Sequence, residues 1–93
     1  ESLVYGPSKA ALDRFTLNLA LDMKPYNITV NGLGPGLVAS EMTKNMDASQ
    51  DRWGRVPAQP EEVVPAALWL AEQDGTNFTG RIVHSDEFCT TWP

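Results

Sequence analysis

The chain has 93 residues, a formal net charge of −5 at pH 7 and 42% hydrophobic residues. It is therefore too apolar for a disordered tail, and its length suits one small domain or part of a larger one. Its seven cationic residues form no cluster, which argues against a nucleic-acid or anionic membrane partner. No apolar stretch is long enough to span a bilayer. The single Cys89 cannot form an internal disulfide. We expect a soluble cytoplasmic protein.

A long helix is expected over residues 7–24. Pro7 is tolerated in a first helical turn, where its missing N–H would be unpaired anyway, and Pro25 ends the helix. One stripe of this helix is apolar and consists of Leu12, Phe15, Leu19 and Met23. Further apolar residues lie off this stripe, so the apolar arc is wider than one packing face requires. We expect one side to pack on a sheet, and another against a second subunit or a segment outside this chain.

A short strand and a long loop follow this helix. Residues 28–33 have β-branched side chains at their start, and residues 34–36 (GPG) end them in a turn, a pattern typical of a strand. Residues 37–59 are too long for a plain connection, which indicates a lid or a substrate-binding loop.

A second helix and a second strand complete the pattern. The helix begins near Pro60, where Glu61 and Glu62 favour the positive end of the helix dipole, and it stops before Asp74. Pro65 is expected to delay regular hydrogen bonding or to bend the first turn. The second strand is expected over 81–85.

A strand, a helix and a strand in this order predict one parallel crossover unit. Two parallel strands are marginally stable alone, and one edge of the first strand would be open. We therefore expect an α/β fold in which residues 1–93 form the C-terminal part of a doubly wound, Rossmann-type parallel sheet. Its order would be helix, strand, loop or lid, helix and strand.

Tyr5 and Lys9 are the first candidates for chemistry. Residues i and i+4 share one face of a helix, so the phenol and the ammonium can meet. A nearby ammonium favours the phenolate, and such a pair can pass a proton to or from an alcohol or carbonyl oxygen. The spacing alone is weakly diagnostic, because Tyr-x-x-x-Lys arises often by chance on helix surfaces.

Three further runs accompany this pair in a fixed order. They are NGLGPGLVASEM at residues 31–42, PEEV at 60–63 and TGRIV at 79–83. With Tyr5 and Lys9, the ordered set resembles the C-terminal part of the short-chain dehydrogenase/reductase family over nearly the whole chain. The resemblance implies an NAD- or NADP-dependent oxidoreductase that moves a hydride between a nicotinamide and a small-molecule carbonyl or secondary alcohol. It also implies a homo-oligomer, commonly a dimer or a tetramer.

The same resemblance assigns the catalytic roles. Tyr5 would be the proton donor or acceptor. Lys9 would assist the ionisation of Tyr5 and would hydrogen-bond the nicotinamide ribose. Both residues would therefore also contact the cofactor. No metal site is predicted.

The resemblance further places Pro35 and Gly36 beside the nicotinamide, where a side chain would obstruct close approach of the backbone. The backbone of Val38 and the hydroxyl of Ser40 would hold the carboxamide. Most relatives have Thr at the latter position, and Ser keeps the hydroxyl. Taken alone, residues 34–36 favour a simple strand-to-loop turn.

Other polar or unusual residues receive no catalytic role. Asn31 is expected to be a satisfied polar residue at the end of a strand, and His84 is expected to be structural within an apolar strand. The glycines that usually follow Asp86 are replaced by Glu87 and Phe88, which puts the subunit contact often made by this end in doubt. Three residues of the long loop could line a substrate pocket or equally pack in a core: Met42, Met46 and Trp53.

The resemblance places two essential elements upstream of residue 1: the glycine-rich phosphate loop and the family's catalytic Ser. The residue that selects NAD or NADP belongs there too. Residues 32–36 do not replace the loop, because a proline-bearing turn without the x-x-Gly spacing does not cradle a pyrophosphate. Ser2 and Ser8 lie too close to Tyr5 to replace the Ser. We expect an incomplete piece that is inactive alone. The rival hypothesis is a non-catalytic remnant that acts as a dimerising or interaction module.

Overall fold

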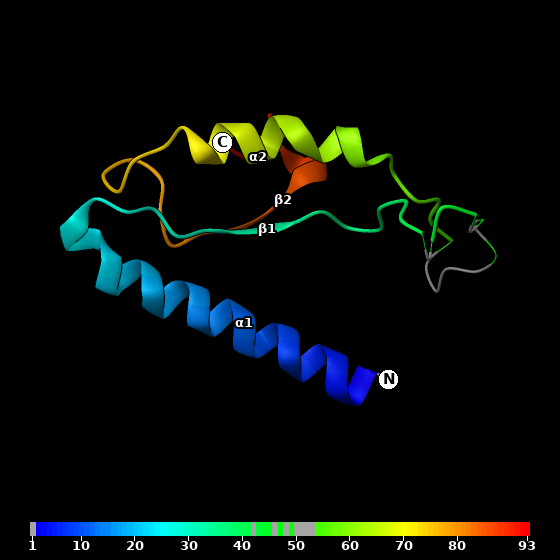
Figure 1. Cartoon of the computed structure of the whole chain (residues 1–93), viewed down its shortest axis with the longest axis horizontal. Coiled ribbons are helices and arrows are strands. Elements are labelled where there is room, and N and C mark those ends of the chain that lie inside the picture. Colours follow the sequence, from blue (N-terminus) through cyan, green and yellow to red (C-terminus); the bar gives the residue numbers. More distant parts are fainter. Residues whose placement is uncertain (1, 42, 46, 48, 50–53) are drawn as a thin grey trace.

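The computed structural model describes residues 2–41, 43–45, 47, 49 and 54–93. Its elements in chain order are α1 (Ser2–Met23), the 3₁₀ helix η1 (Lys24–Tyr26), β1 (Gly32–Gly34), the 3₁₀ helix η3 (Pro60–Val63), α2 (Val64–Ala71), β2 (Ile82–His84) and the 3₁₀ helix η4 (Ser85–Glu87). β1 and β2 pair in parallel, and α1 and α2 lie on opposite sides of them (Figure 1). The α/β fold with a parallel crossover is therefore confirmed. Within the described residues, no helix combines the length and the apolarity needed to cross a bilayer.

The strand register brings the glycines of β1 beneath side chains of β2. Gly32 pairs with Ile82, and Gly34 pairs with His84. A Cβ built on Gly34 would lie 2.5 Å from His84 Nδ1, and one on Gly32 would lie 2.8 Å from Ile82 Cδ1. Side chains of β2 thus occupy the space that larger residues in β1 would fill.

The first strand begins later than expected, at Gly32 instead of residue 28. The preceding residues still follow the second strand, because Gly80 N–H donates to Val30 O at 2.9 Å and Gly32 N–H donates to Arg81 O at 2.8 Å. Between these two bonds, the Asn31 side chain replaces regular strand pairing: its Nδ2 donates to Phe78 O (3.2 Å) and its Oδ1 accepts from Arg81 N–H (3.1 Å). Asn31 is a satisfied structural residue, as predicted.

α1 begins earlier than expected, at Ser2 instead of residue 7, so Pro7 lies inside the helix. Proline disfavours a helical conformation in the residue before it, because the proline Cδ clashes with the Cβ and the backbone N–H of that preceding residue. Gly6 has no Cβ, and this relaxes the restriction at the one position where it applies. The helix therefore continues through Tyr5 and Lys9 without a break.

The buried face of α1 differs from the predicted apolar stripe. Leu12 and Phe15 are 51% and 60% exposed, whereas the buried positions are Thr16 and Ala20. A Cβ on Gly80 would lie 3.5 Å from the Ala20 Cβ, so small residues meet where the helix approaches the strands. Within the wide apolar arc, the side that meets the strands is therefore the one with small residues, because side-chain volume, and not hydrophobicity alone, decides which face can approach a backbone closely.

A compact aromatic core covers the other side of the strands. Its buried members are Ala66, Phe78, Val83 and Trp92, with Trp69 and Phe88 packed against them. Trp69 meets Phe78 edge-on with ring centroids 4.9 Å apart, and Trp92 Nε1–H donates to His84 O at 2.7 Å. The C-terminal tail thus folds back to complete this core.

The 3₁₀ helix η3 precedes α2, and Pro65 is the second residue of α2. The expected delay of regular α-helical bonding is confirmed. The carboxylate of Glu62 accepts a hydrogen bond from the Gln59 backbone N–H, which caps the start of η3.

The two ends of the long loop, residues 37–59, lie side by side. Ala39 N–H donates to Ala58 O at 2.8 Å, and Ala58 N–H donates to Leu37 O at 2.9 Å. The loop therefore leaves β1 and returns beside its own start before η3. Met42, Met46 and Trp53, the predicted pocket residues of this loop, lie outside the described residues.

Candidate active site

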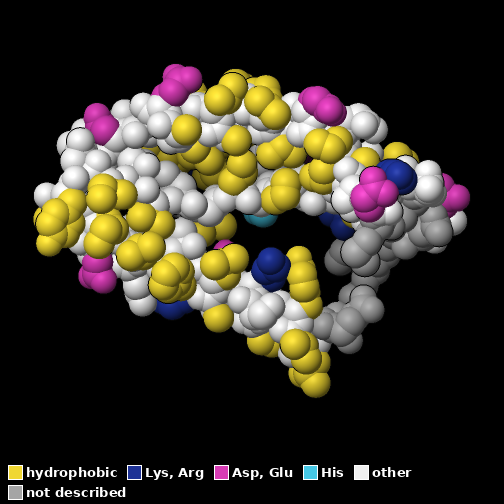
Figure 2. Space-filling view, viewed as in Figure 1, with side chains coloured by type: hydrophobic (Ala, Val, Ile, Leu, Met, Phe, Trp, Pro, Cys, Tyr) yellow, Lys and Arg dark blue, Asp and Glu magenta, His cyan; other side chains and the backbone are white. Residues whose placement is uncertain are grey.

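A cleft of about 1000 Å³ separates α1 from the strands. Figure 2 shows it as a hollow in the middle of the molecule. One wall is formed by successive turns of the helix, namely Tyr5, Lys9, Leu12, Asp13 and Thr16. The other wall is formed by residues 31–37, Ile82, His84, Asp86 and Glu87, and Arg55 also contributes. Gly34 and His84 are the last residues of β1 and β2, so the cleft reaches the carboxyl ends of both parallel strands.

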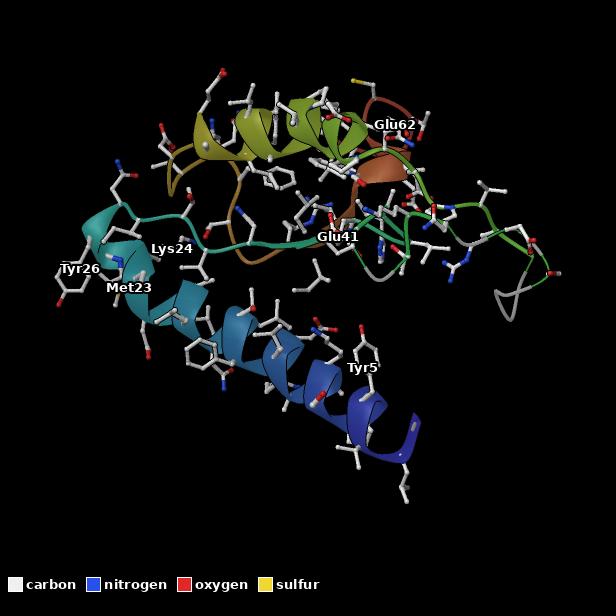
Figure 3. All side chains as sticks on the ribbon, turned by 45° about the vertical axis from the view of Figure 1, so that its right-hand side comes forward. Tyr5, Met23, Lys24, Tyr26, Glu41 and Glu62 are labelled. Atoms are coloured by element: carbon white, nitrogen blue, oxygen red, sulfur yellow. The ribbon has the colours of Figure 1, made fainter. Side chains whose placement is uncertain are left out.

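Tyr5 and Lys9 meet on the cleft side of α1. Lys9 Nζ lies 5.3 Å from the centroid of the Tyr5 ring, and the Tyr5 side chain extends from the helix towards the strands (Figure 3). The Ser8 hydroxyl donates to the Tyr5 carbonyl at 2.7 Å, so this turn has a local side-chain hydrogen bond. The Tyr5 side chain is 64% exposed and open to a bound molecule.

Pro35 and Gly36 lie on the opposite wall of the same cleft. Gly36 has φ +71°, in the left-handed region, and no atom lies within 4 Å of a Cβ built there. The turn needs glycine for its backbone conformation whether or not a cofactor binds. The open space above Gly36 also lets a planar ring approach the backbone. Both interpretations of residues 34–36 are therefore compatible with this geometry.

Val38 and Ser40 lie beyond the cleft wall, because neither is among the described residues that line it. Thr43 joins them. Its hydroxyl donates to Val38 O at 2.5 Å and accepts from Ser40 N–H at 2.9 Å. Tyr5, Lys9, Pro35 and Gly36 thus share one cleft, while the remaining two predicted residues form a hydrogen-bonded turn with Thr43. The roles of all six stay predictions.

Several cleft residues were not predicted from the sequence. Asp13 follows Lys9 by one helical turn, so helical periodicity could have identified it. His84 was expected inside an apolar strand, yet it is exposed and lines the cleft. Its position depends on register with Gly34, which the sequence does not display. Thr43, which is not among the described residues that line the cleft, was not predicted either, and it is distinguished only by its hydrogen bonds to Val38 and Ser40.

Comparison with known proteins gives this geometry a context. The family described as enoyl-(acyl carrier protein) reductase matches residues 1–87. Glucose 1-dehydrogenase 2 of Bacillus subtilis is 32% identical over 96 residues, which cover 96% of this chain and 37% of that protein. The 3-oxoacyl-[acyl-carrier-protein] reductase FabG of Chlamydia trachomatis is 34% identical over 89 residues, covering 88% and 36%.

A solved structure is also similar. It is the crystal structure of a 3-oxoacyl-[acyl-carrier protein] reductase with bound NAD from Brucella melitensis, with a TM-score of 0.63 and 33% identity. The match covers 86% of this chain and 30% of that one. The chain belongs to the short-chain dehydrogenase/reductase family. It spans just over a third of the length of the curated relatives, at 37% and 36%.

Proposed function

We propose that residues 1–93 form the C-terminal part of the nucleotide-binding domain of an NAD(P)-dependent oxidoreductase. The complete protein would move a hydride between a nicotinamide and a carbonyl or secondary alcohol of a small molecule. The observation that carries this proposal is the Tyr5–Lys9 pair, with Nζ 5.3 Å from the ring centroid, on a cleft whose other wall holds Pro35 and Gly36. Family membership supports it, because the named relatives include a dehydrogenase and reductases.

The proposed roles follow from the chemistry of each side chain. In the reducing direction, the Tyr5 hydroxyl gives its proton to the substrate carbonyl oxygen, and the Lys9 ammonium stabilises the phenolate that remains. In the oxidising direction, the phenolate takes the alcohol proton. Tyr5 and Lys9 lie on one helix, so their relative geometry is set before a substrate arrives.

The described residues fit a nicotinamide cofactor. The cleft of about 1000 Å³ is at the upper end of ligand-site volumes, and the backbone of Gly36 is open to a flat ring. Lys9 would bind the ribose, Pro35 and Gly36 would flank the nicotinamide, and Val38 and Ser40 would hold its carboxamide. The bound cofactor supplies or accepts the hydride. The structural relative contains NAD, and we propose NAD or NADP here, with the selecting residue outside this chain.

We also propose that the complete protein is a cytoplasmic homo-oligomer, a dimer or a tetramer. α1 has exposed apolar side chains along its length, with Leu3 85%, Phe15 60% and Leu21 70% exposed. Exposed apolar surface of this kind is typical of an interaction site. Other parts of the complete protein and a second subunit would cover it.

The exposed side chains of α1 also support a second candidate. A non-catalytic relative could keep this helix as a dimerising or interaction module. Cofactor binding separates the two hypotheses. The complete protein should bind NADH or NADPH saturably if the first is correct, whereas a remnant should bind neither. Titration of the protein's tryptophan fluorescence with each cofactor measures this directly.

Substitution of Tyr5 by Phe tests the chemistry. In the complete protein, Tyr5→Phe removes only the hydroxyl, so kcat should fall about 10²–10⁴-fold, the usual contribution of a general acid or base. The cofactor Kd should change little. Tyr26→Phe is the matched control, because Tyr26 is 70% exposed and lies in η1, beyond the C-terminal end of α1. Near-normal turnover by the Tyr5 variant would overturn the assignment.

The proposal that this chain is one part of a longer enzyme has its own test. Intact mass spectrometry of the protein from its natural source should give two to three times the 10.2 kDa of this chain, since the chain spans 37% and 36% of two relatives. The 93-residue chain expressed alone should show no oxidoreductase activity. A natural mass of 10.2 kDa would favour a partner chain or a non-catalytic role.

A further inference from the structure

Thr43 lies at the centre of a hydrogen-bonded turn that contains two proposed cofactor contacts. Its Oγ1 lies 2.5 Å from Val38 O, 2.9 Å from Ser40 N and 3.1 Å from Ser40 Oγ. The backbone of the turn is closed independently of this hydroxyl, because Thr43 N–H and Lys44 N–H both donate to Ser40 O, at 3.1 and 2.7 Å. The hydroxyl is therefore not needed to form the turn itself.

The protons of these bonds can be assigned from chemistry alone. A carbonyl oxygen can only accept, so Thr43 must use its single hydroxyl proton on Val38 O. The Ser40 backbone N–H can only donate, and it occupies one lone pair of Thr43 Oγ1. The remaining contact, between the two hydroxyls, then requires Ser40 Oγ–H to donate to the second lone pair. The hydroxyl of Thr43 is fully used, with one proton given and two accepted.

This assignment fixes the polarity of Ser40. Its own proton points at Thr43, so its Oγ presents lone pairs and no proton to anything that approaches from outside the turn. Ser40 is exposed, so such an approach is open. An exposed serine hydroxyl would otherwise rotate and serve equally well as a donor or an acceptor.

We propose that Thr43 is a positioning residue that sets Ser40 Oγ as a hydrogen-bond acceptor for the amide NH₂ of the nicotinamide carboxamide. The inference rests on the proposed function, in which Val38 and Ser40 hold that group. It adds a residue outside the predicted site and a definite orientation: the carboxamide turns its NH₂ towards Ser40.

The test compares Thr43→Val with wild type in the complete protein, using three probes. These are the reduced nicotinamide cofactor that wild type binds, its 3-acetylpyridine analogue, in which a methyl ketone replaces the carboxamide, and ADP-ribose, which has no nicotinamide. Valine keeps the shape of threonine and removes the hydroxyl. Loss of one hydrogen bond should raise the Kd of the natural cofactor about three- to tenfold. The other two Kd values should not change, because those probes have no carboxamide NH₂.

Two further variants separate positioning from general damage. Thr43→Ser keeps the hydroxyl and should bind all three probes as wild type does. Thr76→Val is the matched control, since the Thr76 hydroxyl bonds Asp74 in an exposed turn that does not line the cleft. It should leave every Kd unchanged.

Any other result contradicts either the positioning role of Thr43 or the proposed function. If Thr43→Val binds the natural cofactor as wild type does, or if all three Kd values rise together, the positioning role is wrong while the proposed function stands. If wild type binds neither the cofactor nor ADP-ribose, the proposed function itself fails. If Thr43→Val does not fold, Ser40→Ala tests the acceptor on which the inference depends, because it removes the Ser40 hydroxyl. Unchanged discrimination between the cofactor and the acetylpyridine analogue would then overturn the inference.

Discussion

The two sides of the strand pair differ sharply in how their apolar side chains are covered. On the α2 side, Phe78 and Trp92 are 8% and 3% exposed. On the α1 side, Phe15 and Leu21 remain 60% and 70% exposed. Full burial of one such side chain stabilises a fold by about 1.5–3 kcal/mol. One side of the sheet therefore has a core of its own, whereas α1 carries apolar surface that becomes stabilising only when something else covers it.

The two regions are joined by small and polar contacts. Ala20 approaches Gly80, and Asn27, which ends η1 in the left-handed region at φ 56°, accepts a hydrogen bond from Gly75 N–H at 2.9 Å. A Cβ on Gly75 would lie 3.1 Å from the Asn27 Cα, so this contact leaves no room for a larger residue. The position of α1 is thus set mainly at its C-terminal end.

The largest expected effect is in the aromatic core. In the complete protein, Trp92→Ala should lower the free energy of unfolding by about 3–5 kcal/mol. Trp92 is only 3% exposed, so the substitution leaves a cavity in the core, and it also removes the hydrogen bond to His84 O. Urea unfolding measures the change. Tyr26→Ala, at a 70% exposed aromatic, should change stability by no more than about 0.5 kcal/mol. Equal effects of the two substitutions would remove the contrast between the regions.

The exposed side chains of α1 should matter for assembly instead. Phe15→Asp in the complete protein should weaken association of subunits by about 2 kcal/mol or more, the scale of an interface hot spot. Sedimentation velocity over a concentration series would show smaller species. Tyr26→Asp controls for the added charge on another exposed aromatic. An unchanged oligomer would mean that Phe15 is not part of a subunit interface.

A smaller effect is expected at the joint between the two regions. Asn27→Ala removes the acceptor for Gly75 N–H. It also puts alanine, which adopts a positive φ less readily than asparagine, at a position with φ 56°. Stability should therefore fall by about 1–2 kcal/mol. Asn27→Gly removes only the acceptor and should cost less. Thermal unfolding of both variants ranks them. If glycine is as harmful as alanine, the hydrogen bond alone accounts for the effect.

The smallest effect is a dependence on acid pH. Hydrogen bonds from the Thr76 hydroxyl, and then from the Thr76 backbone N–H, lower the pKa of Asp74 below its ordinary value of 3.8. Because the pKa is lower in the folded state, the stabilisation is fully present above the unfolded value and is lost as pH falls through the folded pKa. The urea midpoint of Asp74→Asn should therefore fall less than that of wild type below about pH 4. Glu72→Gln, in the adjacent exposed turn, is the control; an identical acid profile for wild type and Asp74→Asn would contradict the assignment.

Much of the fold could be predicted because it depends on local pattern. The order of helix, strand, loop, helix and strand follows from periodicity and from turn residues such as Pro25 and residues 34–36. Element boundaries were less accurate. The helix could start before Pro7 because Gly6 relieves a steric restriction, and the first strand started late because an Asn31 side chain replaces the backbone ladder.

In the candidate site too, local contacts could be predicted and contacts between distant segments could not. Tyr5 and Lys9 were predictable, since a helix alone brings i and i+4 together. The places of His84 and Thr43 were not, because they depend on strand register and on a turn whose bonds join residues in three dimensions.

The sequence by itself determined the α/β order, the Tyr5–Lys9 pair and the resemblance to the family, because each of these rests on residue types at fixed spacing. Only the tertiary structure decided which face of α1 approaches the strands, where the tail packs and which hydroxyl contacts Ser40. Those outcomes depend on whether side-chain volumes and hydrogen-bond donors from distant segments fit together, and spacing along a chain does not encode that fit directly.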